Sequence, residues 1–283
     1  MYLAVKENAF IPRTHHLDLK EPHTFFYHSF KSLETMTATK KLVALVTGAT
    51  GGLGTAMCAK LANDGFHVIA NYRNAEKAKA WAEKMKEQGY EFDMYQGDVA
   101  DYESVGEMVK KIEEEVGPID VLVNNAGITR DTSFHKMTPE MWRQVISTNL
   151  DSVFNTTRHV IERMREQNFG RVINISSVNG QRGQWGQANY SAAKAGIHGF
   201  TKTLAMEVAQ KGITVNTISP GYIATDMVMA VPEPVRDKIV AQIPMGRLGG
   251  TQEIAHLVSF LASKDAAFIT GANYAINGGQ HVY

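Results

Sequence analysis

Short apolar runs alternate with amphipathic, charged stretches from residue 42 to the end of the chain. The apolar runs predict β-strands at residues 42–47, 67–71, 91–96, 119–125, 171–176, 213–219 and 273–277. Helical periodicity lies between them, from the turn after the first strand to about residue 64 and over residues 75–88, 101–116, 140–168 and 188–210. Strands that alternate with helices predict a parallel sheet covered on both faces. With right-handed crossovers, we expect a single, doubly wound α/β domain.

The first 35 residues show neither the apolar runs of the predicted strands nor the periodicity of the predicted helices. They contain Pro12, Pro22 and the cluster "TFFYHSF". They lack the basic start and continuous apolar core of a secretory signal, and their acidic residues are atypical of a mitochondrial presequence. From Met36 the sequence reads "MTATKKLVALVTG", which is typical of the start of a protein. We therefore expect residues 1–35 to be a poorly ordered appendage and residues 36–283 to form the domain.

Composition narrows the class of partner. The 283 residues include 29 Lys and Arg against 29 Asp and Glu, so the formal net charge is zero. This balance argues against a nucleic-acid-binding protein, which needs a concentrated basic surface. Cys58 is the only cysteine, so we expect neither a disulfide framework nor a metal site. No apolar run approaches the ~18 residues of a membrane span. We expect a cytoplasmic protein with no membrane partner.

A glycine-rich turn follows the first predicted strand. It reads "TGATGGLG" and places Gly48, Gly52 and Gly54 between a strand and a helix. Glycines there let the backbone turn sharply and approach a pyrophosphate at the helix N-terminus. The spacing is G-x-x-x-G-x-G rather than G-x-G-x-x-G, and a plain tight turn is the structural alternative. Its place between strand and helix favours the nucleotide site.

Tyr190 and Lys194 lie at positions i and i+4 of a predicted helix and therefore share a face. A free tyrosine, with a pKa of ~10, holds its proton too tightly to exchange it readily near neutral pH. We expect the neighbouring ammonium to lower that pKa and make Tyr190 a general acid. Taken in isolation, the same pattern is typical of a solvated helix face.

Five motifs in order resemble the short-chain dehydrogenase/reductase family over residues 42–283. They are the glycine turn, "NNAG" at residues 124–127, Asn149, "SS" followed by "YSAAK", and "SPGYIATDM". The resemblance implies a Rossmann fold. The segments "NNAGITRD", "ISSVNGQRGQWGQANYS" and "NGGQH" are similar to those of the acetoacetyl-CoA reductases, which supply 3-hydroxybutyryl-CoA for polyhydroxyalkanoate synthesis.

This resemblance implies NADPH-dependent reduction of acetoacetyl-CoA to (R)-3-hydroxybutyryl-CoA by a homotetramer. The tetramer would be built through the long helices at residues 140–168 and 188–210. Two alternatives remain open at this point. One is a 3-oxoacyl-acyl-carrier-protein reductase of fatty-acid synthesis, and the other is a non-catalytic nucleotide-binding sensor or scaffold.

The family resemblance also implies the catalytic residues Asn149, Ser177, Tyr190 and Lys194. Ser177 would hydrogen-bond the substrate carbonyl, Tyr190 would protonate it, Lys194 would also bind the nicotinamide ribose, and Asn149 would support a water-linked proton path. The spacing to Tyr190 favours Ser177 over its neighbour Ser176.

The implied cofactor positions lie at the ends of successive strands. Asp98 and Val99 would meet the adenine, Thr225 would approach the nicotinamide carboxamide, and Asn124 is either structural or a cofactor contact. At the end of the second strand, Asn71 stands where an NAD enzyme has an acid, and Arg73 follows; this favours NADPH. The full set is Gly48, Gly52, Leu53, Gly54, Arg73, Asp98, Val99, Asn125, Ala126, Gly127, Tyr190, Lys194, Pro220, Gly221, Ile223 and Thr225.

The substrate candidates implied by the resemblance are Asp131, Ser177, Gln184, Trp185, Gln187, Tyr190 and Tyr222. Simple packing of the loop is the alternative for Trp185. Asn168 and Lys211 stand where carrier-protein reductases of the family offer arginines, and this favours acyl-CoA over the carrier-protein thioester.

Overall fold

The central sheet is parallel and seven-stranded, with order β3-β2-β1-β4-β5-β6-β7. The computed structural model describes residues 41–282, so the predicted appendage lies outside the described residues. The predicted strands are confirmed, with small shifts at their ends. Their bounds are Val43–Val46 (β1), His67–Tyr72 (β2), Asp93–Gln96 (β3), Val121–Asn124 (β4), Gly170–Ile175 (β5), Ile213–Pro220 (β6) and Asn273–Ile276 (β7).

The helices alternate with these strands, as the periodicity predicts. Four are capped at their N-termini by the side chains of Asn74, Asp101, Thr138 and Ser177, which accept hydrogen bonds from first-turn backbone N–H groups. The bounds are Gly52–Asn63 (α1), Ala75–Glu87 (α2), Tyr102–Glu115 (α3), Pro139–Ile146 (α4), Ser152–Gln167 (α5), Val178–Arg182 (α6), Ala188–Val208 (α7), Asp226–Met229 (α8), Glu233–Val240 (α9) and Thr251–Ala262 (α10).

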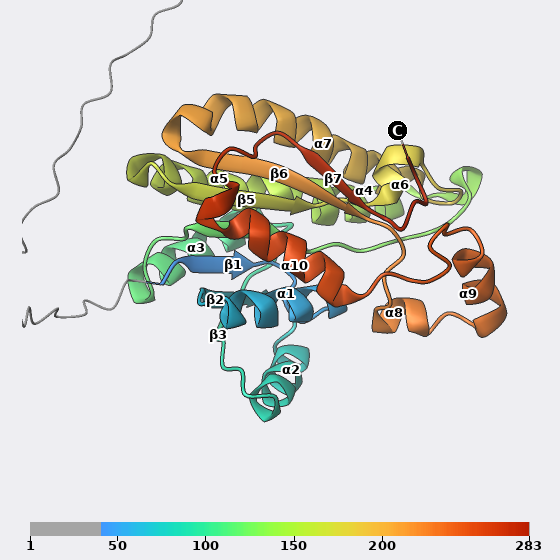
Figure 1. The fold of residues 1–283 in the computed structure, drawn as a ribbon, viewed down its shortest axis with the longest axis horizontal. Coiled ribbons are helices and arrows are strands. Elements are labelled where there is room, and N and C mark those ends of the chain that lie inside the picture. The colour runs from blue at the N-terminus through green and yellow to red at the C-terminus, as the bar shows by residue number, and fades with distance from the viewer. Residues whose placement is uncertain (1–40, 283) are drawn as a thin grey trace, which may run out of the picture. The chain divides into compact units, whose positions relative to one another are not determined.

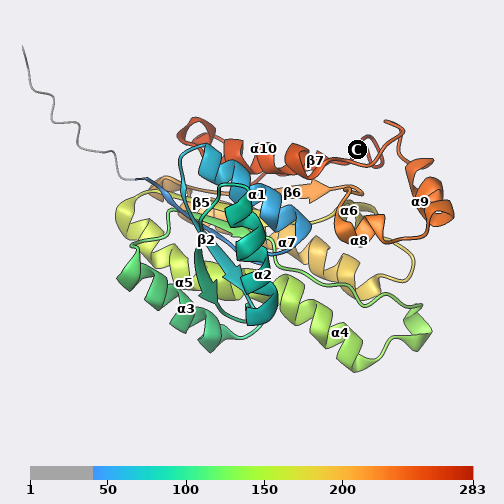
Figure 2. The same cartoon turned by 90° about the horizontal axis from the view of Figure 1, so that it is seen from below.

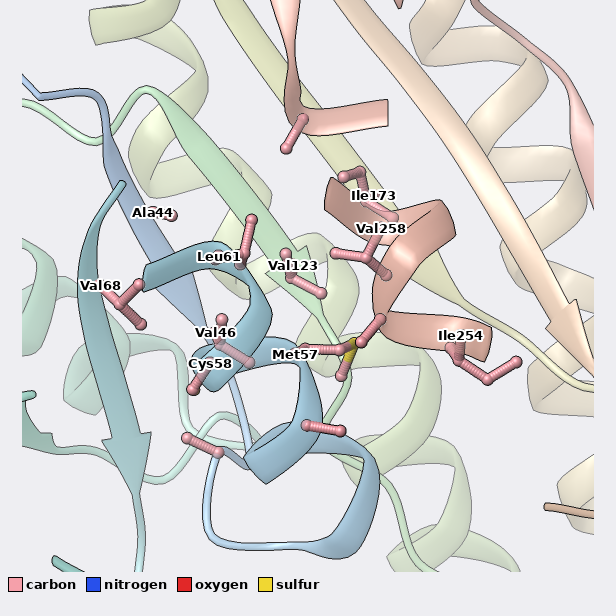
Figure 3. Packing of buried hydrophobic residues seen from close by; sticks show 14 of the residues in the cluster. Ala44, Val46, Met57, Cys58, Leu61, Val68, Val123, Ile173, Ile254 and Val258 are labelled. Carbon is pink, nitrogen blue, oxygen red and sulfur yellow. The ribbon is translucent and has the colours of Figure 1, made fainter. Parts of the chain in front are cut away.

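Two hydrophobic clusters hold the helices to opposite faces of the sheet. One face packs against α1, α2 and α10; Met57, Leu61 and Val258 of this cluster are fully buried against strand residues such as Val46 (Figure 3). The other face, which includes Leu45 of the same strand, packs against α3, α5 and α7. Figures 1 and 2 show α1 and α10 side by side on their face. The three layers are those of the predicted doubly wound α/β domain.

The strand order reverses direction at β1, which lies between β2 and β4. In such sheets ligands bind in the crevice beyond the carboxyl ends of the strands, at the point where the order reverses. The segments after β1, β4, β5 and β6 all leave the sheet at this edge, and they carry the motifs identified in the sequence. Among residues 41–282, no helix is long and apolar enough to span a membrane.

Candidate active site

The glycine turn after β1 is folded so tightly that side chains do not fit within it. Gly48 has φ +61°, and a Cβ there would lie 2.9 Å from Ala126 Cα. A Cβ at Gly54 would lie 2.5 Å from the carbonyl oxygen of Gly48. Both contacts are with backbone and cannot be relieved by moving a side chain. The turn therefore needs these two glycines, whereas Gly51 has room for a Cβ.

Three polar side chains hold the glycine turn in place through hydrogen bonds. The Thr47 hydroxyl accepts hydrogen bonds from the backbone N–H groups of Asn125 (3.0 Å) and Ala126 (3.1 Å). The Asn125 amide donates to the carbonyls of Thr47 (2.9 Å) and Gly48 (3.2 Å). Asn71 is buried, and its Oδ1 accepts from Gly48 N at 3.3 Å. Asn125 therefore supports the nucleotide turn through its side chain, a role that the motif alone does not specify.

The Asn71 side chain is buried and bonded to backbone: besides accepting from Gly48 N, it donates from Nδ2 to the Gly97 carbonyl at 3.1 Å. The exposed group at the end of β2 is instead Arg73, whose Nη1 lies 3.9 Å from Asp98 Oδ2. Two of the predicted cofactor residues, from the ends of β2 and β3, are thus brought together. Val99 beside them is buried, and its carbonyl accepts a hydrogen bond from Asn155 at 3.0 Å.

The N-terminus of α1 provides donors for an anion. Its N-cap, Gly51, has no side chain to cap the first turn, and the first intrahelical bond runs from Thr55 N to Gly51 O at 2.8 Å. Such a helix start presents the N–H groups of Gly52, Leu53 and Gly54 to a pyrophosphate. Thr225, from the segment after β6, closes over the turn, because a Cβ on Gly52 would lie 3.1 Å from Thr225 Cγ2.

That segment after β6 holds the remaining predicted cofactor positions. Pro220 ends β6, and the chain then pairs with Gly249, which donates to the Tyr222 carbonyl at 2.9 Å and accepts from Ala224 N at 2.8 Å. Ile223 is buried in this pairing. Gly221 leaves no room for a side chain, since its Cβ would lie 2.8 Å from Asn277 Cα.

Ser177 and Tyr190 are brought together through their hydroxyl groups. Ser177 follows β5 and caps α6, its Oγ accepting from Asn179 N at 3.1 Å, and it is hydrogen-bonded to the Tyr190 side chain at the start of α7. The neighbouring Ser176 hydroxyl instead donates to the carbonyl of Lys194 at 2.8 Å. The structure thus separates the two serines as the spacing predicts, with Ser177 at the tyrosine and Ser176 in a structural bond.

Lys194 lies on the same face of α7 as Tyr190, but its charge is not directed at the phenol oxygen. Its Nζ is 5.7 Å from the centre of the Tyr190 ring and donates to the Ile175 carbonyl at 2.7 Å. Burial lowers the pKa of Lys194 to about 8. Burial also raises the pKa of Tyr190, and this exceeds the opposing effect of its hydrogen bond with Ser177. The expectation of a lowered tyrosine pKa is therefore wrong here, because desolvation dominates.

Asn149 lies in a π-helical turn, Ser147–Asp151, between α4 and α5. Its buried amide is used on both sides: Nδ2 donates to the Ile128 carbonyl at 2.9 Å, and Oδ1 accepts from Ile128 N at 2.8 Å. A Cβ at Gly127 would lie 3.4 Å from Asn149 Oδ1 and 3.6 Å from Lys194 Nζ. The two predicted catalytic side chains therefore both lie next to Gly127, where a Cβ would make ordinary van der Waals contacts with them.

The predicted substrate residues divide into two groups. Gln187 Nε2 donates to Asp131 Oδ2 at 2.8 Å, so these two form one hydrogen-bonded pair. Gln184 and Trp185 are exposed in the loop between α6 and α7, with 83% of Trp185 accessible. Trp185 therefore does not pack the loop in this structure. Tyr222 lies near enough to Tyr190 to raise the pKa of its phenol, and so belongs near the tetrad, the four predicted catalytic residues Asn149, Ser177, Tyr190 and Lys194.

Two other polar residues have structural partners. The Asn124 amide donates to Asn174 Oδ1 at 2.9 Å and Thr157 Oγ1 at 3.1 Å, which resolves its role as a buried bond across β4 and β5. His198 Nε2 lies 3.3 Å from Ser219 Oγ, one turn beyond Lys194 on α7. Among the described residues, no cluster of three or more His, Cys, Asp or Glu could hold a metal ion.

The Thr47 hydroxyl and Asn189 were missed by the sequence reasoning. Thr47 directly precedes the glycine turn, and its position after a buried strand was the available signal. Asn189 precedes Tyr190 and is fully buried, which the polar text "GQANYS" does not indicate.

Comparison with known proteins agrees with this geometry. The family model for short chain dehydrogenases matches residues 42–236. Acetoacetyl-CoA reductase from Cupriavidus necator is 54% identical over 241 residues, covering 85% of this chain and 98% of that protein. Nodulation protein G from Azospirillum brasilense is 57% identical over 238 residues, covering 84% and 97%. The 3-oxoacyl-[acyl-carrier-protein] reductase of Escherichia coli is 48% identical over 240 residues, covering 85% and 97%.

The match over most of the chain, the parallel sheet and the assembled motifs lead to one assignment. The chain belongs to the short chain dehydrogenase family and is an oxidoreductase that uses a nicotinamide cofactor.

Proposed function

We propose that this protein reduces acetoacetyl-CoA to (R)-3-hydroxybutyryl-CoA with NADPH, a step that supplies polyhydroxybutyrate synthesis. The observation that carries the proposal is the hydrogen-bonded pair of Ser177 and Tyr190 beside buried Lys194, at the edge where the glycine turn also lies. Acetoacetyl-CoA reductases from several bacteria, among them Cupriavidus necator and Rhizobium meliloti, are 54% and 55% identical to it and support the substrate.

The chain's own residues account for the proton in this reduction. A bound nicotinamide would supply a hydride to the carbonyl carbon, and the carbonyl oxygen would then need a proton as negative charge develops on it. The alkoxide that develops is a stronger base than a tyrosine phenolate, so Tyr190 can donate that proton even with its raised pKa, while the Ser177 hydroxyl donates a hydrogen bond to the same oxygen. Lys194 would hold the ribose of the cofactor, and Asn149 would support the path that reprotonates Tyr190.

The choice between NADPH and NADH is proposed from the residues at the end of β2. No carboxylate stands on β2 itself, and Arg73 is 67% exposed at its end, where its guanidinium can pair with a 2′-phosphate. Asp98 is its present partner at 3.9 Å, a distance typical of a weak surface ion pair. We therefore propose that NADPH is preferred over NADH.

Arg73→Ala tests this preference. The ratio of kcat/KM for NADPH to that for NADH should fall by about tenfold or more, about 1.4 kcal/mol of lost discrimination. Arg163→Ala is the matched control, since Arg163 is also exposed and ion-paired, with Glu166 at 2.7 Å. An unchanged ratio in Arg73→Ala, or equal efficiency of the wild type with both cofactors, would contradict the assignment.

The thioester carrier is proposed from the rim of the site. The Asp131–Gln187 pair, Gln184, Trp185 and Tyr222 offer amide and aromatic groups suited to a short acyl-CoA. An acidic carrier protein needs basic docking residues, and Asn168 at the end of α5 has no charge. Lys211 keeps a charge but lacks the planar fork of arginine.

The decisive comparison follows NADPH absorbance with acetoacetyl-CoA and with acetoacetyl-carrier protein under one set of conditions. We expect acetoacetyl-CoA to have the higher kcat/KM and the product to be the (R) isomer. A tenfold preference for the carrier protein, about 1.4 kcal/mol in transition-state binding, would place the protein in fatty-acid synthesis. Tight nucleotide binding without turnover of any carbonyl would instead indicate a non-catalytic sensor.

Assembly and location complete the proposal. We propose a homotetramer in the cytoplasm, built through the regions of α4, α5 and α7. Exposed apolar side chains on these helices support this choice: Trp142, Phe154 and Met206 are 39%, 50% and 76% accessible. Sedimentation of the purified protein would distinguish a tetramer from a monomer.

A further inference from the structure

Residues 128–132 run from the contact with Asn149 to the loop before α7, and we call them the substrate-side segment. Asn149 holds its first residue, Ile128, through two hydrogen bonds. Its last residue, Thr132, donates from its backbone N to Gly186 O at 2.9 Å. Asp131 within it accepts from Gln187 at 2.8 Å. The segment is thus tied to the loop that precedes α7.

Asn189 adds a tie that neither the family motifs nor the proposed mechanism uses. Its side chain is fully buried, and its Nδ2 donates to the carbonyl of Arg130 (3.2 Å), in the middle of the substrate-side segment. The same nitrogen donates to the Met141 carbonyl (3.3 Å) in the first turn of α4. One amide therefore joins α7, α4 and the substrate-side segment; α4 packs on α7.

The other end of this amide acts on the catalytic tyrosine. Asn189 Oδ1 accepts a hydrogen bond from the backbone N of Tyr190 at 2.8 Å. N–H groups in the first turn of a helix have no intrahelical partner and need a cap. The N-cap residue, Gln187, makes no cap bond, because its side chain pairs with Asp131 and Asn179. Asn189 therefore satisfies a donor that would otherwise lack a partner.

We propose that Asn189 is a positioning residue for the reductase reaction, fixing the distance between the Tyr190 hydroxyl and the substrate-side segment that carries Asp131. The inference rests on the proposed function for its kinetic effect, but not for its structural effect. Asp131 is one of the charges that act on the Tyr190 phenol, so its distance from Tyr190 affects the proton donor directly. Losing the amide lets the two sides of the site move apart.

Asn189→Ala tests the proposal against a matched control, Asn216→Ala. Asn216 is also a fully buried asparagine that joins two chain segments: it donates to Ile269 O (2.7 Å) and accepts from Ala272 N (3.1 Å), away from the tetrad. Both variants should lower the melting temperature. Only Asn189→Ala should lower kcat/KM for acetoacetyl-CoA, by about tenfold or more, with the dissociation constant of NADPH within about twofold of wild type.

A second variant separates the bond that Asn189 accepts from Tyr190 N from the bonds that it donates to Arg130 and Met141. Asn189→Asp keeps an acceptor for Tyr190 N, and a carboxylate is favourable in the first turn of a helix. While ionised it cannot donate to Arg130 or Met141, so this variant is assayed at a pH above the pKa of the new carboxyl group. It should fold and still lose kcat/KM for the thioester. In both Asn189 variants, hydrogen exchange of the peptide covering residues 128–132 should accelerate relative to wild type and to Asn216→Ala.

The outcomes separate this proposal from the proposed function. If the wild type does not reduce acetoacetyl-CoA, the function fails, and faster exchange confined to residues 128–132 still supports the positioning role. Unchanged exchange there overturns that role. So do kinetic constants that match those of Asn216→Ala, or failure of both Asn189 variants to fold while Asn216→Ala folds, which would make Asn189 merely structural.

Discussion

Lys194 is a buried cation with no carboxylate partner among residues 41–282. It is 4% accessible, and its Nζ donates to a backbone carbonyl, Ile175 O. Burial lowers its pKa from 10.5 to about 8, so the folded protein releases this proton more readily than the unfolded chain. A charged group that is desolvated in the folded state costs stability while it remains charged. Lys194 therefore lowers the stability of the fold while it is charged, as expected of a group kept for the proposed role in the site.

The pH dependence of stability tests this cost. Below pH 8 the lysine is charged in both states and the cost is fully present. Between pH 8 and 10.5 the unfolded state binds more protons than the folded state, so stability rises with pH. Compared with Lys194→Met, the wild type should gain free energy of unfolding across this window. Denaturant unfolding of both proteins at pH 7 and pH 10 measures the difference, and a constant difference would contradict the low pKa.

At this scale the sequence predicts which residues meet, but not how each is solvated. The i, i+4 spacing and the motif order correctly bring Ser177, Tyr190 and Lys194 together. The direction of the tyrosine pKa was predicted wrongly, because burial depends on segments distant in the sequence. The Asn71 side chain could not be oriented either, since a residue near a strand end can face the core or the ligand.

At the scale of elements, the close contacts in the glycine turn after β1 allow the most specific prediction. Gly54→Ala places a Cβ against the backbone of Gly48 and Ala49, and the turn must distort to accommodate it. The first-turn N–H groups of α1 would then move, and affinity for NADPH should fall by about tenfold or more, about 1.4 kcal/mol. Gly51→Ala is the control, because its Cβ would be 3.6 Å from the nearest neighbour, ordinary contact. Equal affinity in the two variants, measured by NADPH fluorescence titration, would contradict the proposal that this turn binds the cofactor.

The elements themselves follow from periodicity wherever one face is buried. Strands β1, β4, β5 and β6 are buried throughout; β1 and β4 are nearly continuous apolar runs, whereas β5 and β6 also bury polar residues such as Asn174 and Asn216. The helix expected over residues 140–168 is instead α4, the π-helical turn that carries Asn149, and α5. The π-helical turn continues the helix between α4 and α5 with no Gly or Pro to mark it, so the sequence does not reveal it. The short α8 and α9 were also not predicted, because few of their residues are buried.

At the scale of the whole molecule, the open question is how the enzyme depends on its first 35 residues. The described residues 41–282 contain both hydrophobic clusters and all four catalytic candidates. We propose residues 36–283 as the functional domain, and deletion to Met36 should leave a folded, active enzyme. Thermal unfolding and turnover of the deleted and full-length proteins, measured side by side, check this. Loss of solubility or of activity would show that the segment is required.

The role of Tyr190 as proton donor is the central claim, and Tyr190→Phe tests it most directly because the change removes only the hydroxyl group. The measurement pairs kcat for acetoacetyl-CoA reduction with the dissociation constant of NADPH in the same variant. General acid catalysis contributes ~10²–10⁴-fold, and kcat should fall by about that factor or more. NADPH binding should remain within about twofold of wild type, since the ring and Lys194 are kept. Near-normal turnover in Tyr190→Phe would contradict the mechanism.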